Sequence, residues 1–373
     1  MPLVINEEQQ MLRSSAAEFL QKKSPVEALR KLRDSRSGTG YDPAVWQEMA
    51  DMGWTALTIP EAFGGLDFGF TGFGQVLEET GRTLCASPLI STALIGATAI
   101  QHLGTVVQKE ALLPEIGAGT LLVSLAIDES GQHNPDQINT TAEAAGNDFI
   151  LNGRKTFVLD GHVANKLIVV AKSANGISTF LVDAGREGLT VERNIMIDSR
   201  NAATVTLENV RVPARDLLGE EGQAGPALHK VLDIARIGVA AEMLGTVREA
   251  FDRTVAYIKE RKQFDRPIGS FQALQHRAAH MFCEIELSIS VVLKALQAID
   301  EDSPLLPGLA SLAKAKLGSV SQLVTNEAIQ MYGGIGMTDD EEIGFFLKRA
   351  RAANAFLGDH RYHGDRFAKL QGY

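Results

Sequence analysis

A single aspartate stands among basic and apolar residues near the C-terminus of this chain. The stretch KRARAANAFLGDHRYH, residues 348–363, contains one acidic residue, Asp359, between Gly358 and His360. A carboxylate in a site with little water can remove a proton from carbon, because loss of hydration makes it more basic. Asp359 can instead cap a final helix that begins in GDHRYHGDRF, since Asp is among the best N-cap residues. The sequence leaves both roles open.

A cation and a glycine-rich turn form a second pattern. Arg261 lies in IKERKQF, and Gly333 with Gly334 interrupts IQMYGGIGMT. Guanidinium groups and the backbone N–H groups of such a turn bind phosphates, so together they suit a cofactor with a pyrophosphate. Arg261 can also be a solvated charge that complements a helix dipole at its C-terminal end. These residues by themselves leave both roles open.

Three successive parts of the chain must position these groups. Residues 1–120 place apolar side chains at helical spacing, as in residues 7–23. Residues 121–224 contain short β-rich runs between Gly, Asp and Asn, typical of an antiparallel sheet or barrel. Residues 225–373 return to helical spacing, with Ala-rich faces typical of a close-packed bundle. We therefore predict an α+β fold: an N-terminal all-α domain, a middle antiparallel β-barrel domain and a C-terminal four-helix bundle.

Two local features of the chain give sharper predictions. In DFILNGRKTFVL, two β-rich runs flank Asn152 and Gly153, which both tolerate positive φ. This pattern predicts a β-hairpin with its turn at Asn152-Gly153. The apolar stretch LISTALIGATAI is too short to span a bilayer and predicts a buried helix.

Composition argues against several classes of protein. The chain has 373 residues and a net charge of −10, which disfavours a nucleic-acid binder because such proteins need a basic surface. Cys85 and Cys283 are far apart, so neither a disulfide framework nor a zinc site is expected. His360 and His363 have no third ligand at a suitable spacing, so we expect no metal. The N-terminal residues lack the features of a signal peptide, and we expect a cytoplasmic protein without a membrane partner.

Several motifs, taken in order, resemble those of the acyl-CoA dehydrogenase family. The most specific is ERKQFDRPIGSFQALQHRAAHM, residues 260–281, followed by IQMYGGIGMT, residues 329–338. LNGRKTFVLDGHVAN, residues 151–165, and the DIAR of the long helix fit as well. The resemblance covers the whole chain and implies three domains, at residues 1–120, 121–224 and 225–373.

The resemblance implies FAD as cofactor and an acyl-CoA as substrate. In the family, part of the FAD site comes from a neighbouring subunit, so the resemblance implies a homo- or heterotetramer. It also implies an electron-transferring flavoprotein as electron acceptor. The residues that it assigns to FAD binding are Arg261, Gln263, Phe264, Gln272, Gln330, Gly333, Gly334, Phe157 and Ile127.

The implied reaction is removal of the α proton of the acyl-CoA and transfer of a β hydride to the flavin N5, giving a 2,3-enoyl-CoA. In most members the base is a Glu in the C-terminal segment. Counting from the glycine pair places Leu357 or Gly358 there, and the position used by a minority of members holds Ala235. Asp359 is then the remaining candidate base. Alternatively, the chain is a non-catalytic subunit of a heteromeric enzyme for CoA esters such as steroid side chains, or a flavin oxidase or monooxygenase.

Other positions bear on this choice. Where the family has Thr-Glu-Pro followed by Gly-Ser-Asp, this chain has LAIDESGQHNPD, with Ile127 and Asp128 at the Thr-Glu site. Leu159 replaces a Thr and cannot donate the hydrogen bond expected near the flavin, whereas Phe157 can still pack on its ring. These departures favour a heteromeric or modified enzyme.

The long helix carries the implied substrate contacts. Asp233 and Arg236 match an Asp-x-x-Arg that contacts the CoA chain in relatives. The alternative is a helical ion pair at i, i+3, worth a few tenths of a kcal/mol. Glu242 lies farther along the same helix and is more simply a satisfied polar residue than a second base.

Overall fold

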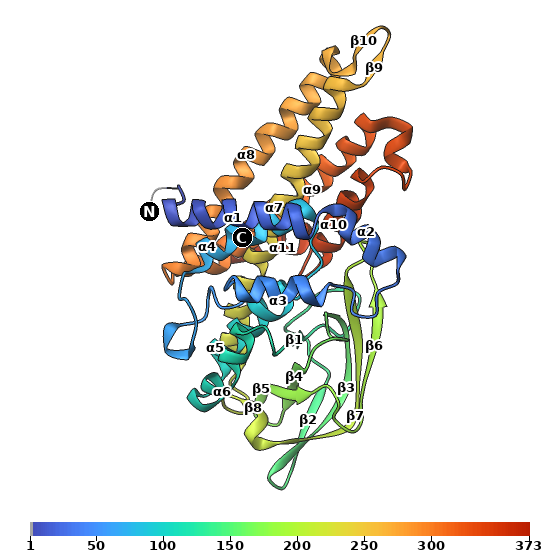
Figure 1. Ribbon diagram of the computed structural model, residues 1–373. Coiled ribbons are helices and arrows are strands. Elements are labelled where there is room, and N and C mark those ends of the chain that lie inside the picture. Colours follow the sequence, from blue (N-terminus) through green and yellow to red (C-terminus); the bar gives the residue numbers. More distant parts are fainter. Residues whose placement is uncertain (1–2) are drawn as a thin grey trace. The chain divides into compact units, whose positions relative to one another are not determined.

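A computed structural model describes residues 3–373 (Figure 1). The chain divides into two compact units. The first contains the residues up to Lys31 together with Phe70–Cys85 and Arg236–Tyr373, and the second contains Leu32–Gly69 and Ala86–Ala235. Helices dominate the first unit and a sheet dominates the second. Each unit is described by itself.

Helices of the first unit gather around α9, which packs against α8, α10 and α11. The apolar side chains that α9 buries recur every three or four residues, including Ala310, Leu317 and Val324. The predicted helical bundle is therefore present. Helices with residues in this unit are α1 (Glu7–Lys23), α2 (Val26–Asp34), α4 (Phe70–Thr83), α7 (Gly225–Glu260), α8 (Gln272–Asp300), α9 (Leu306–Tyr332), α10 (Ile343–Ala355) and α11 (His360–Leu370), with the 3₁₀ turns η4 (Ile268–Ser270) and η5 (Gly333–Met337).

Helices α4 and α7 cross in direct backbone contact. A Cβ on Gly81 would lie 1.9 Å from the carbonyl oxygen of Glu242, and a Cβ on Gly245 would lie 1.7 Å from that of Glu78. Any side chain would separate the two helices, so only glycine permits this crossing.

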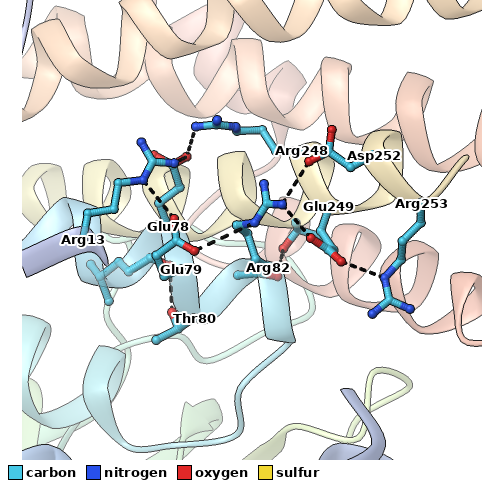
Figure 2. A network of polar contacts seen from close by, with 12 residues as sticks. Arg13, Glu78, Glu79, Thr80, Arg82, Arg248, Glu249, Asp252 and Arg253 are labelled. Carbon is cyan, nitrogen blue, oxygen red and sulfur yellow. Dashed lines mark hydrogen bonds and ion pairs between the residues drawn. The ribbon is translucent and has the colours of Figure 1, made fainter. Parts of the chain in front are cut away.

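Ion pairs hold α1 and α7 to α4 beside this crossing (Figure 2). Arg13 of α1 pairs with Glu78 at 2.6 Å and with Glu79 at 2.9 Å, and Arg248 of α7 also pairs with Glu78. Burial raises the pKa of Glu79, although Arg13 opposes the effect. The network fastens helices from three distant parts of the sequence. It continues through Arg82, Glu249, Asp252, Arg253 and Glu342.

The second unit contains a sheet with the strand order β6-β7-β3-β2-β4-β5-β8, in which β1 pairs with β4. The pairings are antiparallel except for β1 with β4 and β2 with β4. Its strands are β1 (Val123–Ala126), β2 (Thr141–Ala145), β3 (Asp148–Leu159), β4 (Lys166–Ser173), β5 (Gly176–Asp183), β6 (Leu189–Ile195), β7 (Asn201–Pro213) and β8 (Leu217–Leu218). A largely antiparallel sheet agrees with the prediction from the β-rich runs.

Alternate side chains of these strands form one apolar core. It includes Leu151, Val169 and Val205, which are fully buried, and the rings of Phe149 and Phe180, whose centroids lie 5.1 Å apart. Helices of this unit are α3 (Pro43–Asp51), α5 (Ala97–Leu103) and α6 (Val106–Gly117), with the π-helix η2 (Leu89–Gly96) and the 3₁₀ turns η1 (Glu61–Phe63) and η3 (Ala214–Asp216).

The predicted hairpin at Asn152-Gly153 is wrong. Strand β3 runs through both residues, and the turn to its partner β2 lies at Gly146 and Asn147. Gly153 does adopt a φ of 156°, but this accompanies a register shift against β7 rather than a chain reversal. Asn152 and Gly153 therefore provide the conformational freedom that a β-bulge needs. An Asn-Gly pair is compatible with a bulge as well as with a turn.

The stretch LISTALIGATAI forms η2 and the start of α5, and all of its residues are buried, as predicted. Within residues 3–373, no helix is both long enough and apolar enough to cross a membrane.

Candidate functional site

Arg261 lies at the base of an exposed hairpin in the first unit. The residue follows α7 directly, and its carbonyl accepts the N–H of Ile268 at 2.8 Å, which closes the hairpin of β9 (Lys262–Gln263) and β10 (Arg266–Pro267). Its guanidinium is exposed and has no ion-pair partner among residues 3–373. Phe264 at the tip is 86% exposed with a φ of 53°. A cation without an ion-pair partner and an exposed aromatic ring thus belong to one hairpin, and together they can bind an anion that carries a flat ring.

The glycine-rich turn lies close to this hairpin. Tyr257, one helical turn before Arg261, stacks on Tyr332 with ring centroids 4.1 Å apart, and its hydroxyl donates to the carbonyl of Tyr332. Gly333 follows at once with a φ of 67°. A Cβ at Gly333 or Gly334 would meet no atom of the described residues within 4 Å. The turn is thus open, with room for a ligand to approach its backbone.

The remaining predicted FAD ligands of this unit, Gln263, Gln272 and Gln330, are all exposed. Gln272 begins α8 where the hairpin ends, and Gln330 lies in the last turn of α9. The donor set therefore combines one free guanidinium, three amides and open backbone. This chemistry fits a pyrophosphate with an attached nucleoside, as in FAD.

The second unit holds the other two predicted flavin contacts. Phe157 is 49% exposed and has a φ of 52°, in a part of β3 where the register against β7 shifts between Lys155 and Val158. A strained aromatic residue at a bulge is a common mark of a functional site. Ile127 is 4% exposed, so it can offer a ligand little of its side chain.

Sequence reasoning missed a pair of side chains beside Phe157. Nδ1 of His133 lies 2.7 Å from Oδ1 of Asp128, and the two side chains are 3% and 12% exposed. The carbonyl of Asp128 accepts the N–H of Thr156 at 2.7 Å, and the hydroxyl of Thr156 donates to the carbonyl of Ser130. The His133 loop is thereby held against β3 next to Phe157. The sequence did contain a signal for this pair, because Asp128 and His133 lie five residues apart on either side of Gly131.

A buried ion pair fixes the same loop from the other side. Lys155 is fully buried, and its Nζ donates to Oε1 of Glu129 at 2.7 Å and to the carbonyl of Ile127 at 3.2 Å. Glu129 also accepts the N–H and hydroxyl of Thr140. Burial by itself raises the pKa of Glu129, but the hydrogen bonds from Lys155 and Thr140 outweigh it and bring the pKa to about 2. Burial lowers the pKa of Lys155, and Glu129 opposes the effect.

The chain turns sharply between α10 and α11, at the two residues where counting from the glycine pair placed the base that the resemblance implies. Leu357 and Gly358 have φ values of 58° and 100°, and Leu357 is 2% exposed. A Cβ at Gly358 would lie 2.4 Å from the ring of Tyr362, so only glycine fits. The carbonyl of Leu357 accepts from Nε2 of His363 at 2.9 Å and from Nε of Arg236 at 3.3 Å. This corner is tightly held, and neither residue at its apex can act as a base.

Asp359 is the N-cap of α11, which confirms the structural alternative stated from the sequence. Its Oδ1 accepts the N–H groups of Arg361 at 3.0 Å and Tyr362 at 2.8 Å. Its Oδ2 makes no hydrogen bond or ion pair with the described part of the chain. The catalytic role stays a prediction.

Two buried basic groups support the corner. Nζ of Lys314 donates to the carbonyl of Ala353 at 2.7 Å, and burial lowers its pKa to about 7. Burial, followed by Arg236 and Lys314, lowers the pKa of His363 to about 2, so this imidazole is neutral. We did not single out Lys314, although its place on the apolar face of α9 between Ala310 and Leu317 was a signal.

The residues predicted to contact CoA are buried in α7. Asp233 is 2% exposed and Arg236 is fully buried, with its guanidinium carbon 5.8 Å from the ring centroid of Tyr362. Arg236 thus supports the corner within its own unit. Glu242 pairs with Arg349 at 3.3 Å, both 1% exposed, in agreement with a satisfied polar residue. Among residues 3–373, no cluster of three potential metal ligands occurs.

Comparison with known proteins gives a consistent result over the whole chain. The acyl-CoA dehydrogenase N-terminal, middle and C-terminal domain models match residues 6–120, 126–210 and 225–370. The bovine (Bos taurus) mitochondrial short/branched chain specific acyl-CoA dehydrogenase is 30% identical over 97% of this chain and 85% of its own. Acryloyl-CoA reductase (NADH) of Anaerotignum propionicum is 31% identical over 97% and 94%. Among solved structures, the Tcur3481-Tcur3483 steroid ACAD variant is 31% identical and covers 98% of both chains with a TM-score of 0.89.

Proposed function

The chain belongs to the acyl-CoA dehydrogenase family, whose members are FAD-binding oxidoreductases acting on CH–CH bonds, and from this premise we propose that it binds FAD and an acyl-CoA and acts on the Cα–Cβ bond of the acyl group. The observation that carries the proposal is the hairpin of Arg261 and Phe264 beside the open turn of Gly333 and Gly334. FAD supplies the redox chemistry when bound.

In this proposal the protein's own residues bind and orient. Arg261 neutralises the pyrophosphate, while Gln263, Gln272 and Gln330 donate or accept hydrogen bonds at the cofactor's edge. Phe264 would cover an aromatic face of the cofactor, and the exposed ring of Phe157 would pack on a flavin ring. Asp233 and Arg236 are buried in α7, so in this proposal they fix the surface of that helix against which the CoA chain lies. The three domains at residues 1–120, 121–224 and 225–373 belong to the same proposal.

An oligomer completes this site in our account. Phe264, Met337 and Ile335 are 86%, 77% and 45% exposed, and all three lie in the hairpin or the glycine-rich turn. Such apolar exposure indicates a surface that another chain or a ligand covers. We propose a homo- or heterotetramer in the cytoplasm, with an electron-transferring flavoprotein as acceptor. The similarity to the steroid ACAD variant favours a bulky CoA ester and a heteromeric assembly as the alternative.

The corner at Leu357–Asp359 contains the predicted acceptor of the substrate's α proton. Both N–H bonds to Oδ1 show that Asp359 has a structural task, so we propose that the acceptor comes from outside this corner. Asp359 stays the second candidate because its Oδ2 has no partner among residues 3–373. A non-catalytic subunit would take the acceptor from a partner chain.

Substitutions at Asp359 separate cap from base. Asp359→Asn keeps the cap, because Asn is as good an N-cap residue as Asp. We expect flavin bleaching by an acyl-CoA to continue at nearly the parent rate, and Asp359→Ala to lose about 1 kcal/mol of unfolding free energy. Stopped-flow absorbance and urea unfolding measure the two effects. If Asp359→Asn instead loses roughly 100- to 10,000-fold in rate with an unchanged unfolding midpoint, Asp359 is the base.

The proposal as a whole is tested by the flavin content of the protein expressed alone. We expect FAD to be released on denaturation in proportion to the protein. Flavin-free protein that takes up no added FAD would contradict a homotetramer and would point to a partner chain that completes the site, which co-expression with a homologous chain then tests. Rapid oxygen consumption by the reduced protein would identify a flavin oxidase instead.

A further inference from the structure

A polar groove lies between α9, α10 and the start of α11, within the first unit. Its volume is about 200 Å³, which exceeds the roughly 150 Å³ of a cavity that holds one benzene molecule. The groove is therefore large enough for a small molecule but too small to enclose a whole dinucleotide. None of its residues belongs to the set assigned to FAD. The lining residues with a part in binding are Gly318, Ser321, Thr325, Arg351, Asn354 and His360.

Gly318 allows two polar side chains to lie against α9 in this groove. A Cβ at Gly318 would lie 2.3 Å from Oδ1 of Asn354 and 2.7 Å from Cβ of His360. Both distances are too short for atoms that are not bonded to one another, so α9 needs glycine at this position. The places of Asn354 and His360 are thus determined by the packing of three helices.

Hydrogen bonds between Asn354 and His360 determine which ring atom of His360 can meet a ligand. Oδ1 of Asn354 accepts the backbone N–H of His360 at 3.2 Å, and Nδ2 of Asn354 lies 3.4 Å from Nδ1 of His360. Because Nδ2 is a donor, Nδ1 accepts, and the proton of the neutral imidazole is on Nε2. Nε2 has no hydrogen-bond partner among residues 3–373. This N–H is therefore available to an oxygen atom of a ligand.

Arg351 adds a positive charge to the lining. Its guanidinium is exposed and makes no ion pair or hydrogen bond with the described part of the chain. Residues 348–363 contain four Lys or Arg residues and a single acid, Asp359, in a chain whose net charge is −10. Oδ1 of Asp359 already accepts the N–H groups of Arg361 and Tyr362, so side chains and not the helix N-terminus provide the free donors. This local excess of positive charge favours an anionic ligand.

Two buried hydroxyl groups give the groove acceptors as well. Ser321 and Thr325 are 1% and 0% exposed and lie one helical turn apart on α9. Their hydroxyls donate to the carbonyls of Gly318 at 3.1 Å and of Ser321 at 2.7 Å. Neither hydroxyl oxygen accepts a hydrogen bond from a residue within 3–373. A ligand that satisfies this lining must therefore donate hydrogen bonds as well as accept them.

We propose that the groove binds a ribose phosphate group. The phosphate oxygens accept from the guanidinium of Arg351 and from Nε2 of His360, and charged donors of this kind bind phosphate strongly. The ribose hydroxyls donate to the oxygen atoms of Ser321 and Thr325. This binding does not depend on FAD or on the proposed reaction. The same group occurs in a free ribose phosphate and in the 3′-phosphoribosyl part of CoA.

Isothermal titration calorimetry of the full chain with ribose 5-phosphate tests the proposal. We expect saturable binding that weakens as the ionic strength rises, because Arg351 is exposed to solvent. Arg351→Gln should weaken binding by roughly 10- to 100-fold, the loss expected for a hydrogen bond to a charged group. Arg361→Gln is the matched control, since Arg361 is also exposed but does not line the groove. This control should bind as the parent does.

A pair of glycine variants tests the geometry of the groove. Gly318→Ala should displace Asn354 and His360 and abolish binding. Gly308→Ala changes the same helix, but its new Cβ would meet no described atom nearer than 3.7 Å, so binding should be unchanged. Urea unfolding shows whether each variant keeps the parent fold. If Gly318→Ala does not fold, Arg351→Gln decides, because its exposed side chain has no partner within residues 3–373.

Competition experiments identify the source of the ribose phosphate. Displacement of ribose 5-phosphate by CoA but not by dephospho-CoA would identify the 3′-phosphoribosyl part of CoA as the ligand. Displacement by neither would identify a free ribose phosphate.

Four results would overturn the proposal. They are no binding of ribose 5-phosphate by the parent even at millimolar concentration, equal losses in Arg351→Gln and Arg361→Gln, equally tight binding of inorganic phosphate, and loss of FAD from Arg351→Gln. The last result would assign the groove to the cofactor. The FAD content of the parent protein tests the proposed function separately, so the failure of one proposal is distinguishable from the failure of the other.

Discussion

Arg261→Gln is expected to weaken FAD binding by roughly 10- to 100-fold, because a hydrogen bond to a charged group contributes about 1.5–3 kcal/mol. The guanidinium is exposed and has no ion-pair partner within residues 3–373, so its removal leaves no buried group unsatisfied. Binding should therefore fall while folding stays intact. Titration of deflavinated protein with FAD, followed by flavin fluorescence, measures the change.

Lys262→Gln is the matched control for Arg261. It removes the same charge from the next residue of the same hairpin, and Lys262 is also exposed. If both variants lose affinity for FAD equally, the loss reflects only the total positive charge of the hairpin. The proposed specific contact of Arg261 with the pyrophosphate would then be wrong. A selective loss with Arg261→Gln would support a direct contact with the pyrophosphate.

Glu129→Gln is expected to cost about 3 kcal/mol of unfolding free energy, because removing one partner of a buried ion pair leaves the other charge uncompensated. Lys155 is fully buried, and the Glu129 side chain is 11% exposed. The variant should also loosen the loop that carries His133, since Glu129 holds that loop through Thr140. Urea unfolding at neutral pH measures the cost.

The pH dependence of stability gives the same prediction an independent check. The pKa of Glu129 falls from 4.5 to about 2 on folding, so its contribution is fully present above about pH 4.5. That contribution is lost as the pH falls from about 4.5 toward 2. This part of the decrease in unfolding free energy with falling pH should be missing in Glu129→Gln. Asp183→Asn is the control, since Asp183 and Lys166 form an ion pair that is 51% and 28% exposed and should contribute less than about 1 kcal/mol. Equal costs for the two variants would contradict the account of the buried pair.

Much of the fold could be predicted from local patterns. The apolar spacing of residues 7–23 coincides with α1, and Asn6 and Gln9 form a capping box at its start. The β-rich runs of the middle segment became strands of a largely antiparallel sheet. Such patterns depend on nearest neighbours in the chain and are visible in a single sequence.

The errors arose where tertiary contacts decide between local options. Asn152 and Gly153 allow a turn, but pairing of β3 with both β2 and β7 keeps the strand continuous and uses the glycine in a bulge. Leu357 and Gly358 adopt positive φ values and turn the chain between α10 and α11, a corner that depends on contacts with Arg236, Tyr362 and His363.

The candidate site was predicted only in part. The hairpin of Arg261 and the turn of Gly333 are contiguous motifs, and the structure brings them together through the stacked Tyr257 and Tyr332. His133 escaped notice because its relation to Asp128 depends on the path of a loop fixed by Glu129 and Lys155, which no periodicity reveals.

The most direct test of the account is anaerobic titration of the protein expressed alone with a panel of acyl-CoAs, linear and bulky, while the flavin absorbance is followed. The account predicts bound FAD, bleaching by at least one acyl-CoA, and an enoyl-CoA product two hydrogens lighter than the substrate. Full FAD occupancy without bleaching by any member of the panel, even after mixing with a homologous chain that carries the usual Glu, would contradict it.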